Sequence, residues 1–316
     1  MSARLLDGRE LASHLRRELQ HRLERLVDPE AEGADAPCLA IVRDASSEPA
    51  SVYAASLERA ARSIGAAARI IDAEEAAAGA GLEATIAGLN ADPMVAGIVI
   101  AQPFADAARG RRLVELIDPA KDVDGATPTN AGRLARGEPA FVPATALAVV
   151  AILEGYGVEV ASRRAVVVGR SAVVGRPVAS LLLARDATVV ICHRATRNLA
   201  RETRRAEILV AAAGQPGLIR PEMVNRSTVI VDCGINAVDG RIVGDVEFDA
   251  VAPVVRAISP VPGGVGTVTP MMVLRQTVES AERMRSTGHA AGHSGSASMS
   301  SSGTEPSMNP SRSIVS

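Results

Sequence analysis

Apolar residues near the start of the chain recur at the spacing of an amphipathic helix. The apolar stripe consists of Leu11, Leu15, Leu19, Leu23 and Leu26. Residues three or four positions apart lie on one face of a helix, so this stripe predicts a helix that packs on a core. Asp7 precedes it, with Glu10 three positions later, a pattern that resembles a capping box at the helix start.

Beyond this helix, short apolar runs alternate with segments of helical pattern. Strands are predicted at 38–42, 68–71 and 95–101, and helices at 51–64, 81–90 and 109–117. Strands and helices that alternate in this order imply a mostly parallel sheet with helices packed on it. This part of the chain therefore predicts a first α/β domain.

A second alternating series follows a loop-rich stretch at 119–139. It begins with an almost wholly apolar helix at 145–157, which we expect to bridge two domains. Strands are predicted at 165–169, 188–192, 207–212, 228–234 and near 254–258, and a last helix at roughly 268–285. Thr267 and Pro270 are the residue types that begin helices. The fold class is thus α/β with two domains, the second Rossmann-like, and the Ser- and Gly-rich end is predicted to be a disordered tail.

Composition excludes several classes of protein. Hydrophobic residues make up 47% and charged residues 22%, which is typical of a globular chain, and aromatics reach only 2%, so Ala, Val, Leu and Ile must build the core. The net charge is −2 with no basic stripe, so we expect no nucleic-acid binding. The three cysteines form no CxxC pair and the five histidines no metal-binding spacing, which predicts reduced thiols and no metal. The N-terminus lacks a signal-peptide core, and no apolar run approaches the ~18 residues of a membrane span, so a cytoplasmic protein is expected.

The segment AVVVGRSAVVGRPVASLLL at 165–183 reads as a strand, a glycine turn and a helix. Such a turn brings backbone N–H groups and a helix N-terminus against a pyrophosphate. The spacing differs from the usual GxGxxG, because Ser171 stands where the second glycine would be and Gly175 falls one residue late. A tight strand–helix turn that binds nothing is the alternative.

The next strand favours NADP over NAD. An NAD site usually places a carboxylate about twenty residues after the glycine turn, to bind the ribose 2′-hydroxyl. Here the strand at 188–192 is followed by His193 and Arg194, with no acid. Arg194 and Arg170 can instead bind a 2′-phosphate, since guanidinium groups match phosphate oxygens. The alternative is that both arginines are solvated surface charges.

Several segments together resemble the bifunctional methylenetetrahydrofolate dehydrogenase/methenyltetrahydrofolate cyclohydrolase family over about residues 4–285. They are PASVY (49–53), KDVDG (121–125), GRSAVVGRP (169–177), CHRATRNL (192–199), GQPGLI (214–219), VDCGIN (231–236), IVGDVEFD (242–249) and PVPGGVGTVT (260–269). The resemblance implies two α/β domains with a cleft between them, tetrahydrofolate derivatives as substrates, NADP as the cofactor, a role in one-carbon metabolism and purine biosynthesis, and a homodimer. The domains would be 1–144 plus 267–286 for folate, 145–266 for NADP, and the tail at 287–316.

The resemblance also assigns site residues. The cofactor-binding positions are Gly169, Arg170, Ser171, Gly175, Arg176, His193, Arg194 and Ile235. The substrate-binding positions are Tyr53, Asp124, Pro262, Gly263 and Gly264, of which Tyr53 and Asp124 are also the catalytic candidates. A carboxylate at Asp124 can accept hydrogen bonds from the pterin 2-amino group and N3–H together, which are adjacent donors.

Each substrate-side assignment has a simpler alternative. Asp124 precedes Gly125 in a pair that is common in turns, and Asp122 with Asp124 forms a DxD pair that a metal can use. The glycines at 263–264 let backbone approach the folate closely, or they form a flexible connector.

The chain departs from the family pattern at several positions, and the changes affect mainly one of the two reactions. The family usually has Tyr-x-x-x-Lys where this chain has Tyr53 and Leu57. It also usually has a Gln two residues before a proline; when that proline is aligned with Pro103, the position of the Gln is Ala101. PATA stands at 143–146 where PCTP is usual, and Thr267-Val268 replaces Pro-Met. A shift that brought Gln102 inward would point it to the opposite face of the strand.

These departures affect hydrolysis more than oxidation. Hydride transfer depends mainly on positioning, whereas hydrolysis needs a proton carrier that is typically worth ~10²–10⁴-fold. Tyr53 alone, with an ordinary pKa near ~10, is poorly matched to neutral pH. The sequence therefore predicts methylenetetrahydrofolate dehydrogenase activity with a weak or lost cyclohydrolase step. The alternatives are a fully bifunctional enzyme that makes 10-formyltetrahydrofolate, a non-catalytic folate- or NADP-binding paralogue, and a dehydrogenase for another small substrate.

Overall fold

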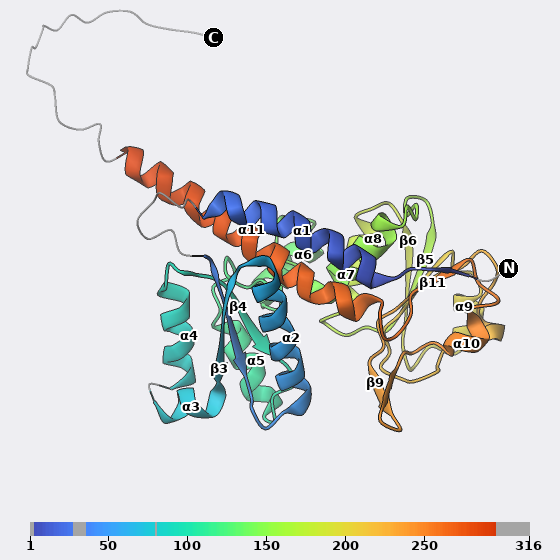
Figure 1. Cartoon of the computed structure of the whole chain (residues 1–316). Helices are drawn as coiled ribbons and strands as arrows, with labels where there is room; N and C mark the ends of the chain where they lie inside the picture. Colours follow the sequence, from blue (N-terminus) through green and yellow to red (C-terminus); the bar gives the residue numbers. More distant parts are fainter. Residues whose placement is uncertain (1–2, 28–35, 80, 295–316) are drawn as a thin grey trace, which may run out of the picture.

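Two parallel sheets, joined by long helices, make up the protein. The computed structural model describes residues 3–27, 36–79 and 81–294, with the side chains up to residue 286. A three-stranded sheet forms the first domain and a six-stranded sheet the second, and they lie at opposite ends of the molecule (Figure 1). This arrangement confirms the predicted α/β fold with a Rossmann-like second sheet. In the described ranges, no helix has the length and apolar character that a membrane crossing needs.

The first sheet has the strand order β3-β2-β4, and all its pairs are parallel. Its strands are β2 (Cys38–Arg43), β3 (Ala67–Asp72) and β4 (Val95–Ala101). The helices of this half are α1 (Gly8–Leu26), α2 (Glu48–Ile64), α3 (Ala73–Ala78), α4 (Leu82–Ala91), α5 (Ala107–Glu115) and α6 (Pro128–Ala135). Alternate residues of β2 and β4 face the α2 side and the α4–α5 side, where they join two separate apolar clusters. Ala101 belongs to the cluster on the α2 side.

The second sheet has the order β1-β11-β8-β7-β5-β6, again with parallel pairs only. Its strands are β1 (Arg4–Leu5), β5 (Arg164–Val168), β6 (Thr188–Cys192), β7 (Ile208–Ala211), β8 (Val229–Asp232) and β11 (Ala257–Ile258). The remaining elements are α8 (Gly175–Leu183), α9 (Leu199–Thr203), the 3₁₀ turn η1 (Pro221–Met223), the hairpin β9 (Asn236–Val238) with β10 (Arg241–Val243), and α10 (Phe248–Val251).

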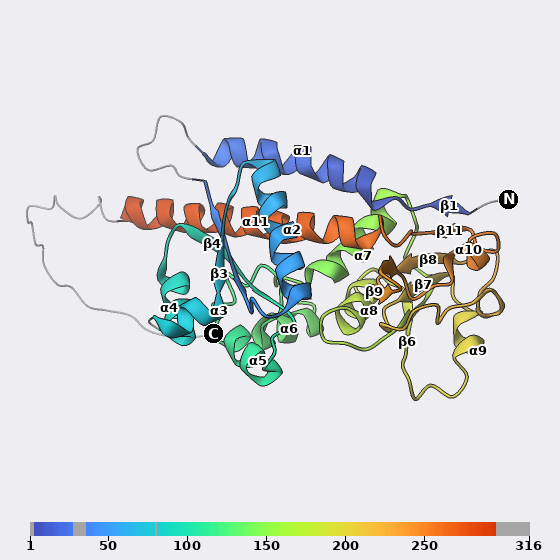
Figure 2. The same cartoon turned by 60° about the horizontal axis from the view of Figure 1, so that its bottom comes forward.

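Helices α7 (Ala144–Gly155) and α11 (Val265–Ser294) connect the two halves. α11 lies beside α1 along much of its length in both views (Figures 1 and 2), and it also packs on α2, α7 and β4. α7 packs on α11 and on α8, as expected of the apolar helix predicted to bridge the domains. One buried apolar cluster therefore runs from the first sheet, through these helices, to the second.

Five features differ from the sequence-based expectation. The N-terminal residues 4–5 form an edge strand of the second sheet, although they precede the first domain. The helix predicted at 81–90 is preceded by the short helix α3, and α6 lies inside the predicted loop at 119–139. α11 begins at Val265, so Thr267 and Pro270 lie inside the helix and do not begin it. α11 also extends to Ser294, past the predicted end at 285; the rest of the predicted tail, 295–316, lies outside the described residues.

Candidate functional site

The carboxyl edge of the six-stranded sheet gathers most of the predicted cofactor residues. Because the strands are parallel, the loops after β5, β6, β8 and β11 leave the sheet at the same edge. Gly169 to Ser171 follow β5, His193 and Arg194 follow β6, Ile235 follows β8, and Pro262 to Gly264 follow β11. The fold thus places residues from four distant parts of the sequence on one edge, which is where open α/β sheets bind ligands.

Glycines make the turn between β5 and α8 tight. Gly169 has φ of 135°, and a Cβ there would overlap the carbonyl oxygen of Ala212 after β7. A Cβ on Gly175, the first residue of α8, would overlap the carbonyl oxygen of Gly169. Both glycines are therefore required for close packing of the helix start on the strand end, whatever the turn binds.

The turn leaves backbone donors free at the surface. The Ser171 hydroxyl oxygen accepts hydrogen bonds from the backbone N–H of Val174 (3.1 Å) and Gly175 (3.4 Å), so it caps the start of α8. The backbone N–H groups of 170–173 make no hydrogen bond within the described part of the chain, and residues 170–173 are exposed. Exposed N–H groups beside a helix N-terminus are suited to bind phosphate oxygens.

Positively charged side chains surround these donors. Arg170, Arg176 and Arg194 are all exposed, on the β5–α8 turn, on α8 and on the loop after β6. His193 is half-buried, and its Nδ1 accepts from the backbone N–H of Ala195 at 3.2 Å, which fixes the loop around Arg194. Ile235 is 70% exposed at the same edge, an unusual environment for an isoleucine.

Two buried carboxylates organise this edge and were not among the predicted site residues. Asp245 accepts hydrogen bonds from the backbone N–H of 213–215 (2.6 to 2.9 Å) and so shapes the loop after β7. Asp232 accepts from the N–H of Gly234, Asp245 and Val246, while burial raises its pKa to about 6. The available sequence signal for Asp232 is an acid at the end of the buried strand β8, which is typical of a loop-capping carboxylate; Asp245 follows the exposed hairpin strand β10 and has no such signal.

Asp124 lies between the first sheet and α7. The preceding residues of its loop are fixed on β4 by the hydrogen bond from Ile98 N–H to the Lys121 carbonyl (2.8 Å). Burial, together with the nearby charge of Asp122, raises the pKa of Asp124 to about 7, against the opposing effect of a hydrogen bond from the Ala144 N–H at the start of α7. The residue as a whole is partly exposed, while its carboxyl group is deep enough for burial to be the largest cause of the shift. A pKa of about 7 means that both the protonated and the ionised carboxyl group are populated near neutral pH.

Tyr53 on α2 is close enough to Asp124 for their charges to interact. Burial, and then the carboxylate of Asp124, raise the pKa of Tyr53 well above its ordinary value. The phenol is consequently protonated at neutral pH, a state in which it donates a hydrogen bond and does not accept a proton. The structure brings together the two side chains that the sequence analysis named as catalytic candidates.

Two positions at which the sequence resemblance expects polar side chains are apolar and closed to solvent. Leu57, one helical turn after Tyr53, and Ala101, at the end of β4, both have 0% exposure. Both belong to the apolar cluster against which Tyr53 packs. Gln102 does not occupy the place of Ala101: its Oε1 accepts from the N–H of Phe104 (3.2 Å), and its amide lies against Gly110 of α5 on the other side of the sheet.

The glycine loop before α11 contacts the N-terminus of α1. Gly263 has φ of 114° and its carbonyl accepts a hydrogen bond from the Gly8 N–H at 2.8 Å. A Cβ on Gly264 would lie only 2.6 Å from the carbonyl oxygen of Pro260. These contacts pack the turn at 262–264 against the start of α1. The predicted role of this turn in folate binding stays a prediction.

The DxD pair does not form a metal site in the described ranges. Asp122 is buried, and its oxygens accept from the N–H of Ala126 (2.9 Å) and Thr127 (2.8 Å) and from the Asn130 side chain (2.9 Å). Asp122 thus shapes the turn that leads into α6. No group of three His, Cys, Asp or Glu side chains suited to a metal ion occurs among the described residues.

Two models of one known protein family together match almost all of the described residues. Residues 6–124 match the model of the tetrahydrofolate dehydrogenase/cyclohydrolase catalytic domain, and residues 143–285 match that family's NAD(P)-binding domain. The bifunctional protein FolD 1 of Paenarthrobacter aurescens is 44% identical over 91% of this chain and 97% of its own length. The bifunctional protein FolD of Chloroflexus aurantiacus is 43% identical over 88% of this chain and 97% of its own.

Solved structures show the same fold. The bifunctional FolD methylenetetrahydrofolate dehydrogenase/cyclohydrolase of Campylobacter jejuni superimposes with a TM-score of 0.82 at 36% identity, covering 89% of this chain and 99% of that one. The Trypanosoma brucei enzyme, solved with NADP cofactor and an inhibitor, has a TM-score of 0.82 at 33% identity and covers 90% of this chain and 98% of that one.

Proposed function

Since the chain belongs to the tetrahydrofolate dehydrogenase/cyclohydrolase family over both of the family's domains, we propose that it keeps the dehydrogenase reaction and has weak or no cyclohydrolase activity. The retained reaction is the oxidation of 5,10-methylenetetrahydrofolate to 5,10-methenyltetrahydrofolate. The observation that carries the proposal is that Leu57 and Ala101, which stand where the sequence resemblance expects Lys and Gln, are fully buried residues of the apolar cluster against which Tyr53 packs.

The cofactor is NADP, as the sequence analysis predicted. The family model over 143–285 is an NAD(P)-binding domain, and the T. brucei relative is complexed with NADP. The β5–α8 turn fits this group, because the free N–H groups of 170–173 can bind its pyrophosphate and Arg170 and Arg194 its 2′-phosphate. When bound, NADP accepts the hydride of the reaction.

We assign pterin recognition to Asp124. An ionised carboxylate here can accept hydrogen bonds from two adjacent pterin donors, and its burial makes those charge-assisted bonds stronger than in water. The protonated Tyr53 beside it can donate a hydrogen bond to the bound folate. Oxidation then requires the two domains to hold the methylene carbon against the nicotinamide, which is a task of positioning.

Hydrolysis demands more of the side chains. A water molecule must lose a proton as it attacks the methenyl carbon, and a nitrogen must gain one as it leaves. Leu57 and Ala101 cannot carry a proton, and the raised pKa of Tyr53 makes its phenol a poor base at neutral pH. The apolar surface around them also binds water weakly.

A fully bifunctional enzyme is the second candidate, and two observations favour it. The relatives from P. aurescens and C. aurantiacus are both named bifunctional. In addition, Asp124 has a pKa of about 7, which is near the value of an efficient general base at neutral pH. In this candidate Asp124 takes the proton that the usual Lys would handle.

The deciding experiment measures both reactions on one preparation. Oxidation of methylenetetrahydrofolate is followed with NADP, and hydrolysis of methenyltetrahydrofolate is followed by its absorbance, with a bifunctional relative as the reference. We expect oxidation at a rate similar to the reference and hydrolysis slower by ~10²–10⁴-fold. Hydrolysis at the reference rate contradicts the proposal and supports the second candidate, whereas NADP binding without any oxidation supports a non-catalytic paralogue.

Three further expectations from the sequence stay predictions. They are the folate domain 1–144 plus 267–286 with the NADP domain 145–266, a homodimer, and a cytoplasmic location. Light scattering of the purified protein measures the oligomeric state directly. A monomer that oxidises methylenetetrahydrofolate at the reference rate would contradict the homodimer without affecting the proposed reaction.

A further inference from the structure

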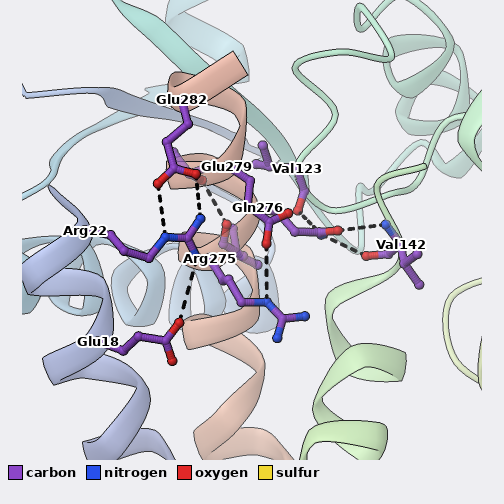
Figure 3. Close-up of polar contacts among 10 residues, drawn as sticks. Glu18, Arg22, Val123, Val142, Arg275, Gln276, Glu279 and Glu282 are labelled. Atoms are coloured by element: carbon purple, nitrogen blue, oxygen red, sulfur yellow. Dashed lines mark hydrogen bonds and ion pairs between the residues drawn. The ribbon is translucent and has the colours of Figure 1, made fainter. Parts of the chain in front are cut away.

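The long helix α11 carries a buried amide side chain that bonds outside its own helix. Gln276 is 3% exposed and points toward the loop before Asp124 and the segment before α7 (Figure 3). Its Nε2 donates to the carbonyl oxygens of Val123 (2.7 Å) and Val142 (2.9 Å), and its Oε1 accepts from the N–H of Val142 (2.9 Å). The amide nitrogen donates two hydrogen bonds and the amide oxygen accepts one, and together these three bonds fix the orientation of the amide.

The two segments that Gln276 joins are the two that hold Asp124. The Val123 carbonyl belongs to the peptide group that leads directly into Asp124. Val142 stands two residues before Ala144, whose N–H donates to the Asp124 carboxyl group. Gly125, with φ of 60°, lets the segments touch, because a Cβ there would overlap the backbone of Val142. One side chain thus fixes both the backbone before this carboxyl group and the segment that supplies its donor.

Further contacts hold α11 and the Val142 segment in place. Arg22 of α1 forms an ion pair with Glu282 of α11 at 2.7 Å, and Figure 3 shows this pair on the side of α11 away from Val142. The guanidinium of Arg283 lies over the ring of Phe141 at 4.8 Å, next to Val142. The helix is therefore held from two sides, and Gln276 transmits its position to the loop of Asp124.

We propose that Gln276 is a positioning residue for folate binding, acting through Asp124; the inference rests on the proposed function. Without the amide, two buried carbonyls and one N–H lose their partners, and such groups turn toward other donors or water. Rotation of the Val123–Asp124 peptide then moves the carboxylate away from the pterin donors. A charge-assisted pair of hydrogen bonds depends strongly on this direction.

The test replaces Gln276 by methionine, which has similar length and cannot form these bonds. For Gln276→Met we expect the KM for methylenetetrahydrofolate to rise about tenfold, the size of one lost hydrogen bond, with the KM for NADP and kcat within about twofold. Thr277→Val is the matched control, because Thr277 is as buried on the same helix and bonds only to Val273 of that helix. We expect the control to leave both KM values unchanged.

A double-mutant cycle separates positioning from general loss of stability. If Gln276 acts through Asp124, Gln276→Met should add less than twofold to the KM of an Asp124→Asn enzyme. Equal losses for folate and NADP, full additivity with Asp124→Asn, or a Thr277→Val enzyme with the same defect each overturn the proposal. If Gln276→Met does not fold, Gln276→Glu, which keeps the length but loses both donors, is measured in the same way.

The outcome is distinguishable from failure of the proposed function. A wild-type protein that binds folate without oxidising it refutes the dehydrogenase, yet the role of Gln276 is then tested through the dissociation constant for folate by calorimetry. A wild-type protein that binds NADP but no folate refutes both. Folate binding that Gln276→Met leaves unchanged refutes the positioning role alone.

Discussion

The β5–α8 turn and the part of α2 that carries Tyr53 differ in the kind of group that would contact a ligand. The turn exposes backbone N–H groups at 170–173, and its shape depends on glycines at 169 and 175. On α2 the chemistry depends on side chains, and Leu57, like Ala101 at the end of β4, is a buried residue of the apolar cluster against which Tyr53 packs. Backbone donors survive most substitutions, whereas a proton carrier is lost with one residue. This difference is the basis of the proposal that the chain keeps cofactor binding and has a weak cyclohydrolase reaction.

Restoring the side chains that the family resemblance expects on α2 and β4 gives the largest predicted effect. Leu57→Lys combined with Ala101→Gln supplies an amine one helical turn after Tyr53 and an amide at the end of β4, and we expect the hydrolysis of methenyltetrahydrofolate to rise ~10²–10⁴-fold. The hydrolysis assay measures this directly, and Leu57→Met with Ala101→Gln is the control without a proton carrier. A double variant that folds and binds folate, but hydrolyses no faster than this control, means that the site has lost its geometry as well as its amine.

Adding a side chain to the β5–α8 turn should have the largest effect on the binding of the cofactor. Gly169→Ala forces a Cβ against the Ala212 carbonyl at a φ of 135° that side chains rarely adopt, so we expect NADP affinity to fall at least ~100-fold. Gly88→Ala is the control: in α4 it meets no atom within 4 Å and should stabilise the protein by ~0.5–1 kcal/mol. Calorimetry with NADP and urea unfolding measure the two quantities. Unchanged NADP affinity in Gly169→Ala would place the cofactor elsewhere.

The arginines of the turn should decide which dinucleotide binds. Arg194→Ala removes a guanidinium from the place predicted for the 2′-phosphate, and we expect NADP affinity to fall roughly ten- to fiftyfold while NAD affinity changes little. Arg226→Ala is the control, because Arg226 is also exposed but precedes β8, at the opposite edge of the sheet. The measurement is kcat/KM with each dinucleotide. Equal losses for both would show that Arg194 acts on the fold and not on the phosphate.

Local sequence pattern was sufficient for much of this fold. The alternating runs predicted both sheets, because a buried strand and an amphipathic helix each have their own period. β1 could not be predicted, since it has only two residues and pairs with β11 at 257–258, far along the chain. Local pattern predicts a helix start near Pro270, but α11 begins at Val265 and continues through the proline. Tertiary contacts decide such cases.

The site residues divide in the same way. Gly169, Ser171 and Arg194 belong to contiguous motifs, which a sequence displays directly. The roles of Asp245, which holds the loop at 213–215, and of Gln276, which joins Val123 to Val142, depend on segments far away in sequence. A buried glutamine in an apolar helix has no periodic signal of its own. Side chains that support a site from a distance are therefore the part that sequence reasoning misses.

The smallest predicted effect concerns pH and separates the two regions without any mutation. The pKa of Asp124 is raised to about 7, mainly by burial, so lowering the pH through 7 protonates the carboxylate that we expect to bind the pterin. The KM for methylenetetrahydrofolate should then rise about tenfold between pH 8 and pH 6, because about one carboxyl group in ten is ionised one pH unit below its pKa. The KM for NADP, measured over the same range, is the internal reference.

The same shift makes a statement about stability, with a definite sign. The folded-state pKa of Asp124 lies above its ordinary value of 3.8, so the folded state binds the proton more tightly than the unfolded state between about pH 4 and pH 7. The contribution of Asp124 to stability therefore falls as pH rises through this window and is constant above it. Asp124→Asn removes this charge, so it should be more stable than the wild type at pH 8, with the advantage shrinking at pH 5, while its KM for folate is higher than that of the wild type at pH 8. Urea unfolding at the two pH values measures the difference; an Asp124→Asn protein that is less stable at pH 8 would mean that the carboxylate holds its own loop together and was not retained for a ligand.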